Sequence, residues 1–189
     1  WVIVGAGLVA AVVGSVLFVR RQRGLEQPLL EFSIFRNPAF SAGVLAAAFS
    51  MFAIGGSQLV TTQRYQLVEG FTPLEAGLLV AAAAIGSLPT ALLGGAFLHR
   101  IGLLPLIAGG LAVASLGVVV VIIGVQADVF GVLVAGLLVT GAGLGGAMSV
   151  ASTAIVGNVP ARRAGMASSV EEVSYEFGSL TAVALLGSL

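Results

Sequence analysis

Long apolar stretches that follow one another with short connections constrain this chain more than any other feature. A transmembrane helix needs about 20 apolar residues to cross about 30 Å of hydrocarbon. Six stretches of the 189-residue chain meet that length: residues 1–19, 39–61, 74–98, 103–125, 129–157 and 165–189. Only 8% of the residues are charged, whereas a soluble domain usually has about 25%. We therefore predict an all-α integral membrane protein with six transmembrane helices.

The composition argues against several other classes of protein. The formal net charge is zero and every cationic side chain is an arginine, so we expect no basic surface and no nucleic-acid partner. The chain has no cysteine and a single histidine, which gives neither a disulfide framework nor a metal cluster. We find no Ser/His/Asp set, HExxH helix or phosphate-binding loop, and expect neither an enzyme nor a bound cofactor.

The arginines predict which ends of the helices face the cytoplasm. Seven of the eight lie in three connections, residues 20–38, 99–102 and 158–164, and only Arg64 lies elsewhere. By the positive-inside rule these three connections are cytoplasmic, and residue 1 starts on the extracellular side of a cell membrane. The chain begins and ends inside apolar runs, so we expect it to be a fragment of a longer, multi-pass protein.

Three further segments predict local structure. Residues 28–35 have the pattern of an amphipathic interfacial segment, with an extended linker as the alternative. Gly141 and Gly145 have the spacing of a close helix-packing motif. Pro89 lies inside the third apolar stretch and is expected to bend that helix, because proline cannot donate a backbone hydrogen bond.

Three carboxylates in the sixth apolar stretch, Glu171, Glu172 and Glu176, are the candidate functional residues. A carboxylate at membrane depth costs several kcal/mol unless it is neutralised, hydrated or paired, so a proton or cation site is the default hypothesis. Counted from Ala164, the helical rise places Glu171 about 10 Å and Glu176 about 18 Å along the helix. Glu176 is therefore expected near the middle of the bilayer.

The helical spacing separates these carboxylates into two faces. Glu172 and Glu176 are four residues apart and share a face, whereas Glu171 is rotated by about 100° from Glu172. Two carboxylates on one face repel each other in low dielectric, so at least one should take up a proton near neutral pH. We rank Glu176 first, with Glu172 as its partner, because Glu171 could instead extend to the cytoplasmic interface. Tyr175 could offer its ring to a lipophilic cation, although simple packing is the default explanation.

Residues 95–102 resemble the loop motif Gly-x-x-x-Asp-Arg-x-Gly of the major facilitator superfamily. Gly95, Arg100 and Gly102 match this motif, and His99 stands at the acidic position. In that family the loop helps to hold one conformation through charge contacts at a helix end. The resemblance therefore implies that the turn is kept, whereas the missing acid argues against the full gating role.

Three longer segments, residues 28–37, 65–77 and 162–173, resemble the fourteen-helix drug:proton antiporter branch of that superfamily, which includes quaternary-ammonium and multidrug exporters. They resemble, in order, the start of the ninth helix, the loop and start of the tenth, and the start of the thirteenth. The resemblance implies that the chain covers roughly helices eight to thirteen. Residues 1–19 would then be a linker transmembrane helix, residues 20–38 a cytoplasmic connection, and residues 39–189 the first five helices of the C-terminal half.

The resemblance also implies a function. Acidic residues of the thirteenth helix are implicated in proton coupling and cation recognition in this branch, and they match Glu171, Glu172 and Glu176. We therefore expect proton-coupled efflux of lipophilic cations by alternating access, with the lipid bilayer, protons and a missing N-terminal half of the chain as partners. Two alternatives stay open: a carrier of the same fold for an anionic metabolite or a lipid, and a membrane module that binds a partner without transport.

Overall fold

The computed structural model describes residues 2–24 and 32–187. Contacts divide the chain into two units, residues 1–34 and 35–189. The first unit contains the helix α1 (Val2–Arg23), whose last turns carry Arg20 and Arg21. The short 3-10 helix η1 (Phe32–Arg36) runs across the boundary between the units. The interfacial segment predicted at residues 28–35 thus lies partly outside the described residues, and its last part is helical.

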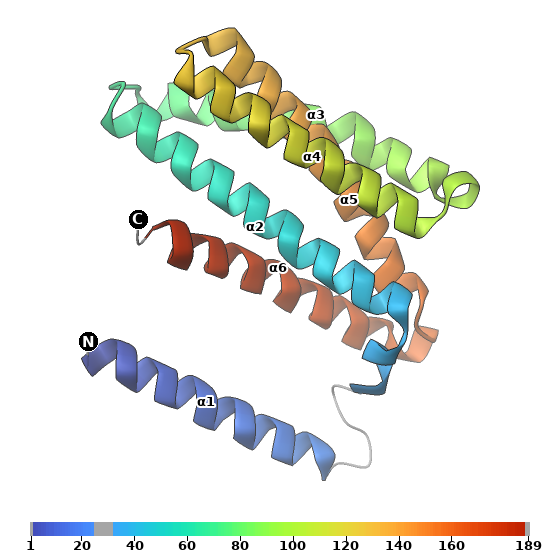
Figure 1. The fold of residues 1–189 in the computed structure, drawn as a ribbon. Coiled ribbons are helices and arrows are strands. Elements are labelled where there is room, and N and C mark those ends of the chain that lie inside the picture. The colour runs from blue at the N-terminus through green and yellow to red at the C-terminus, as the bar shows by residue number, and fades with distance from the viewer. Residues whose placement is uncertain (1, 25–31, 188–189) are drawn as a thin grey trace. The chain divides into compact units, whose positions relative to one another are not determined.

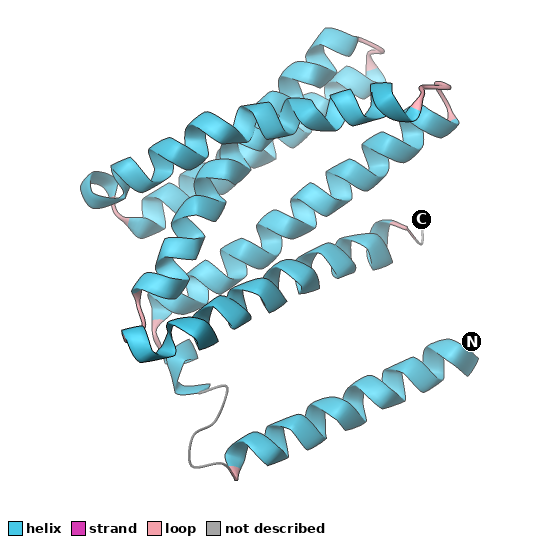
Figure 2. Cartoon of the chain, turned by 180° about the vertical axis from the view of Figure 1, so that it is seen from behind, coloured by secondary structure: helices cyan, strands magenta, loops and turns pink. Residues whose placement is uncertain are grey.

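The second unit is built from five long helices joined by short loops. These are α2 (Pro38–Leu67), α3 (Pro73–Ile101), α4 (Leu103–Gln126), α5 (Phe130–Gly157) and α6 (Ala164–Leu186), with the 3-10 helix η2 (Ala161–Arg163) before α6. Figure 1 shows α6 alongside α2, and α3, α4 and α5 packed together. The described residues contain no strand (Figure 2). The all-helical prediction is confirmed.

Membrane-spanning length is met by α1 to α5, which are the described helices long and apolar enough to cross a bilayer. The sixth predicted span, residues 165–189, corresponds to α6, which has 23 residues but carries the three carboxylates Glu171, Glu172 and Glu176 in its first and middle parts. These carboxylates distinguish α6 from a purely apolar span. A charged residue within a membrane helix marks a functional position by default, so α6 is the helix that most strongly suggests a functional site.

Local sequence signals set the ends of several helices. Asn37 caps α2, since its side chain accepts a hydrogen bond from the backbone N–H of Ala39 at 3.0 Å. Thr72 and Glu75 form a capping box at the start of α3, in which each side chain accepts a hydrogen bond from the other residue's backbone N–H. Gly102 ends α3 and begins α4 with φ +90°, a backbone conformation that favours glycine.

The core of the second unit lies around α5. Half of the residues in the apolar stretch of α5 are buried, a larger share than in any other candidate membrane-spanning helix. Its glycines allow close approach on two sides. A Cβ atom at Gly141 or Gly145 would overlap the backbone of α3, and one at Gly136 or Gly143 would overlap the backbone of α4. The close packing predicted from the Gly141 and Gly145 spacing is confirmed, whereas α3 continues as one helix through Pro89.

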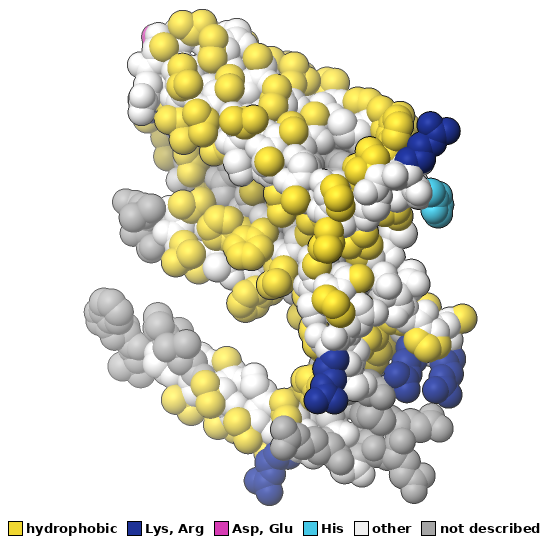
Figure 3. Space-filling view, turned by 45° about the vertical axis from the view of Figure 1, so that its right-hand side comes forward, with side chains coloured by type: hydrophobic (Ala, Val, Ile, Leu, Met, Phe, Trp, Pro, Cys, Tyr) yellow, Lys and Arg dark blue, Asp and Glu magenta, His cyan; other side chains and the backbone are white. Residues whose placement is uncertain are grey.

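Charged side chains are unequally divided between the two ends of this bundle. Because successive helices reverse direction, one end carries Arg36, Arg100, Arg162 and Arg163, and the described loops at that end contain no acidic residue. The other end carries Arg64, Glu69, Glu75 and Asp128. Figure 3 shows arginine atoms at one end of the second unit and hydrophobic side chains over its flank. Apolar flanks between polar ends are what a lipid-embedded bundle requires.

Candidate functional site

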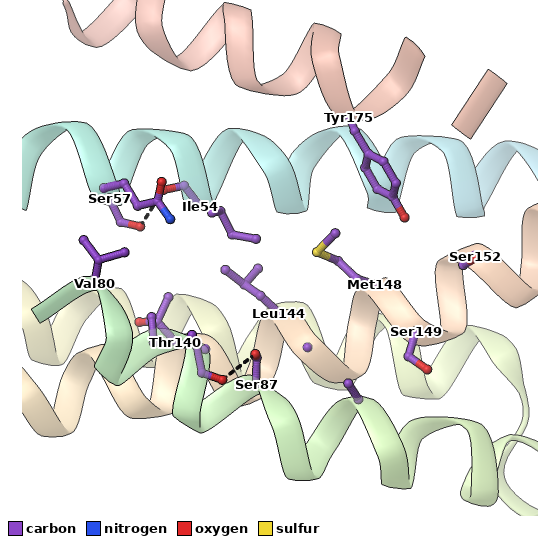
Figure 4. Close-up of a pocket in the computed structure, with 16 residues that line it drawn as sticks. Ile54, Ser57, Val80, Ser87, Thr140, Leu144, Met148, Ser149, Ser152 and Tyr175 are labelled. Atoms are coloured by element: carbon purple, nitrogen blue, oxygen red, sulfur yellow. Dashed lines mark hydrogen bonds between the residues drawn. The ribbon is translucent and has the colours of Figure 1, made fainter. Parts of the chain in front are cut away.

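A cavity of about 510 Å³ lies inside the second unit, between α2, α3, α5 and α6 (Figure 4). It occupies the middle of these helices, since its lining runs from Thr140 to Ser152 on α5 and from Val80 to Ala91 on α3. Its polar lining residues are Ser57, Gln58, Ser87, Thr140, Ser149, Ser152 and Tyr175. None of the lining residues is charged.

Several of the lining hydroxyl groups donate their hydrogen to their own helix. Ser57 donates to the carbonyl of Ile54 at 3.0 Å, Ser87 to the carbonyl of Ala84 at 2.8 Å, and Thr140 to the carbonyl of Gly136 at 2.8 Å. A hydroxyl has one hydrogen to donate but two lone pairs, so a hydroxyl bonded in this way can still accept. These groups therefore offer the cavity hydrogen-bond acceptors, which suit a ligand with donors or positive charge.

Tyr175 links the cavity to a buried carboxylate. Its side chain comes from α6 and forms part of the cavity lining (Figure 4). Its hydroxyl group donates a hydrogen bond to Oε1 of Glu171, one helical turn earlier, at 2.6 Å. The side chain of Glu171 does not line the cavity, and the residue is only 9% exposed. The carboxylate of Glu171 is therefore connected to the cavity through Tyr175 but is not part of the cavity lining.

The other two carboxylates of α6 lie on a different face. Glu172 and Glu176 are both exposed and share their face with Val173, Phe177 and Leu180, which are exposed as well. Their common face agrees with the predicted four-residue spacing. The sequence ranked Glu176 and Glu172 ahead of Glu171 by depth along the helix, and that ranking stays a prediction. The structure adds that Glu171 is buried whereas Glu172 and Glu176 are exposed. The alternative that placed Glu171 at the membrane interface does not fit its buried, hydrogen-bonded side chain.

Small residues explain why α6 turns this face inward. The buried positions of α6 are Ala167, Glu171, Ser174, Gly178 and Ala182, which repeat at helical spacing. A Cβ atom at Gly178 would overlap the backbone of α2 at Ala48, so the two helices approach closely along this stripe. The sequence contains this signal, since a stripe of small residues marks a packed helix face in membranes. This stripe predicts that Glu171 lies on the packed face of α6.

The loop-motif residues lie at the arginine-rich end of the bundle. Gly95, His99 and Arg100 are in the last turns of α3 and are exposed, and Gly102 forms the turn into α4. None of these residues lines the cavity. Among the described residues, neither His99 nor Arg100 takes part in an ion pair, and the ion pair that the structure does show joins Arg64 and Glu69 at 3.8 Å. The turn that the motif predicts is present.

A bundle of membrane-length helices around a ligand-sized pocket without a charged lining residue defines a polytopic membrane protein. The family model of the Major Facilitator Superfamily matches residues 1–183, and the chain belongs to this family of transporters.

Several curated relatives of this chain are named as drug efflux or resistance proteins. The chain is 30% identical to the multidrug efflux pump LfrA of Mycolicibacterium smegmatis over 184 residues, which cover 97% of this chain and 36% of LfrA. It is 32% identical to the multidrug resistance protein Stp of Mycobacterium tuberculosis, covering 95% of this chain and 33% of Stp. It is 27% identical to the methyl viologen resistance protein SmvA of Salmonella typhimurium, covering 92% and 35%. The chain thus spans about a third of the length of these relatives.

Proposed function

We propose that this chain is part of a drug exporter that exchanges protons for lipophilic cations. In this proposal residues 1–19 form a linker transmembrane helix, residues 20–38 a cytoplasmic connection, and residues 39–189 the first five helices of the C-terminal half. An N-terminal half would complete the central cavity, and the two halves would rock to give alternating access. The family and the efflux relatives support transport of a small molecule.

The cavity is the observation that carries this proposal. Its volume of about 510 Å³ lies within the range of about 300–1,000 Å³ that is typical of small-molecule sites. It lies at mid-depth in helices of membrane-spanning length, where a transported molecule must pass. A partner-binding module without transport would have no need of such a space, so the transport proposal is favoured.

Two observations favour a cationic substrate over an anionic one. The lining hydroxyl groups offer acceptors, and no arginine lines the cavity to bind an anion. The relative SmvA is named for resistance to methyl viologen, a flat dication. A lipophilic cation would be attracted both by these acceptors and by a deprotonated carboxylate in α6.

The carboxylates of α6 supply the proposed proton coupling. A deprotonated carboxylate attracts the cation from the cytoplasmic side, and a proton that arrives from outside removes that attraction and releases the cation. Proton and drug therefore compete for the same negative charge. We assign this role first to Glu171, which is buried beside the cavity, and then to Glu172 and Glu176, whose exposed face is available to whatever packs against α6.

The division of charges supports a sidedness for the exporter. The bundle end with Arg36, Arg100, Arg162 and Arg163 would face the cytoplasm of a cell membrane, because loops rich in arginine are retained there. The end with Glu69, Glu75 and Asp128 would face outward. Drug would then enter from the arginine-rich end and leave toward the acidic end.

Single carboxylate-to-amide substitutions test the proposal. Everted membrane vesicles that contain the full-length gene product are acidified inside, and proton release on addition of tetraphenylphosphonium is followed with a pH-sensitive dye. The variant E171Q should abolish cation-driven proton release, and E172Q and E176Q should reduce it. The control E69Q replaces an exposed carboxylate in the loop between α2 and α3 and should behave as wild type. Undiminished exchange in all three α6 variants would refute the assignment.

A further inference from the structure

The cavity has no charged lining residue, yet the proposed substrate is a cation. A cation in an uncharged cavity needs a source of negative potential in its wall. The hydrogen bond from Tyr175 to Glu171 connects the cavity lining to a carboxylate. Resting on the proposed function, we infer that Tyr175 is a specificity-determining residue that presents the negative charge of Glu171 to a cationic substrate through its ring.

Geometry separates the two parts of this arrangement. Tyr175 is partly buried and lines the cavity, whereas Glu171 lies behind it and is 9% exposed. A ligand in the cavity therefore meets the tyrosine ring rather than the carboxylate. The hydroxyl group points toward Glu171 because the 2.6 Å bond holds it there, which also fixes the orientation of the ring.

The electronic consequence follows from the direction of this hydrogen bond. A phenol that donates its hydrogen to a carboxylate gains electron density on its oxygen and ring, because hydrogen bonds polarise both partners. A more electron-rich ring face attracts a cation more strongly. Tyr175 thus makes a better cation site when Glu171 is charged, and a weaker one when Glu171 is neutral.

Few other charged residues lie near enough to neutralise or replace the charge of Glu171. The helix α5 carries no charged residue, and the only one in α2 is Arg64, which lies in its last turn at the opposite end of the bundle. In α3 the charged residues Glu75 and Arg100 lie in the first and last turns. On α6 itself Glu172 and Glu176 are exposed, and Arg162 and Arg163 precede the helix. The negative charge that Tyr175 can transmit therefore comes first from Glu171, to which it is hydrogen-bonded, with a smaller contribution from Glu172.

A double-mutant cycle in the purified full-length protein tests the inference. The variant Y175F keeps the ring and removes the hydrogen bond, while E171Q removes the charge and keeps an acceptor for the Tyr175 hydroxyl. Binding of radiolabelled tetraphenylphosphonium should weaken by about three- to tenfold in each. The double variant should be no weaker than E171Q alone, because both changes break one linked interaction. Y175L, which also removes the ring, should bind more weakly than Y175F.

An uncharged probe and a matched tyrosine variant separate recognition from packing. Tetraphenylmethane resembles the cation in shape, and its binding should not change in Y175F or E171Q. The control Y65F alters the other tyrosine of the chain, which lies outside the cavity and packs against Phe71 with the two rings tilted. Equal losses for both probes, or additive losses in the double variant, would overturn the inference. If Y175F bound the cation like wild type while proton exchange remained intact, the role of Tyr175 would be refuted and the proposed function would stand. Wild-type protein that bound no cation would refute both proposals.

Discussion

The contact between α5 and α3 beside the cavity yields a prediction that the structure makes quantitative. Gly145 lines the cavity, and a Cβ atom at this position would lie 2.8 Å from both Cα and Cβ of Ser87. The carbonyl oxygen of Ser87 would lie closer still, and ordinary contact begins at 3.4 Å, so G145A must push the two helices apart by more than about 0.6 Å. Such overpacking costs about 1–3 kcal/mol. The gain in helix propensity from Gly to Ala, about 1 kcal/mol, offsets only part of that cost.

The neighbouring glycine provides a matched control for this variant. A Cβ atom at Gly146 would have its nearest neighbours in Thr90 at 3.8 Å, which is ordinary contact. G146A should therefore be neutral or slightly stabilising, while G145A should unfold at a lower temperature when the full-length protein is heated in detergent. G145A should also change the KM for cation efflux, because Ser87 and Gly145 both line the cavity. Equal unfolding temperatures for G145A and G146A would refute the packing argument.

Two further predictions concern the ends of α3. G102A forces an L side chain onto φ +90° and should destabilise the turn by about 1–3 kcal/mol. Trypsin should then cleave after Arg100 faster than in the wild type. The control G95A, which has open space around its Cβ atom, should be cleaved like the wild type. T72A removes the capping box and should cost about 1 kcal/mol, seen as faster hydrogen exchange in the first turn of α3. Unchanged cleavage in the first case, or unchanged exchange in the second, would contradict these assignments.

Much of the fold was predictable from local sequence. Apolar length alone located the helices, and their ends follow residues with known capping chemistry, such as Asn37 with Pro38 and Thr72 with Glu75. The observed α2 nevertheless continues to Leu67, beyond the predicted residue 61, because helical hydrogen bonding persists after the apolar run ends. Hydropathy measures the part of a helix that suits lipid, not the full helix.

The candidate site was predictable only in part. The sequence drew attention to Glu171, Glu172 and Glu176 and to the face that the last two share, and whether these carboxylates bind protons or cations remains a prediction. It also placed Glu171 on a different face from the other two, but it ranked the three by depth along the helix, and only the structure shows that the face of Glu171 is the buried one. A helix that is apolar on most sides has no strong amphipathic signal, so the face that packs against protein must be inferred from small residues such as Gly178.

The amino-acid sequence is enough to assign the class of this protein, because the cost of exposing backbone groups to lipid leaves helices as the solution for apolar stretches of this length. It also determined the unequal distribution of arginines between the two ends. Tertiary packing, in contrast, sets the pocket that α2, α3, α5 and α6 line together, and it places Tyr175 in that lining while its hydroxyl group donates to Glu171. Such a site depends on the rotation and close approach of four separate helices. That arrangement is set by contacts between residues far apart in the chain, such as Gly178 against Ala48 and Gly145 against Ser87.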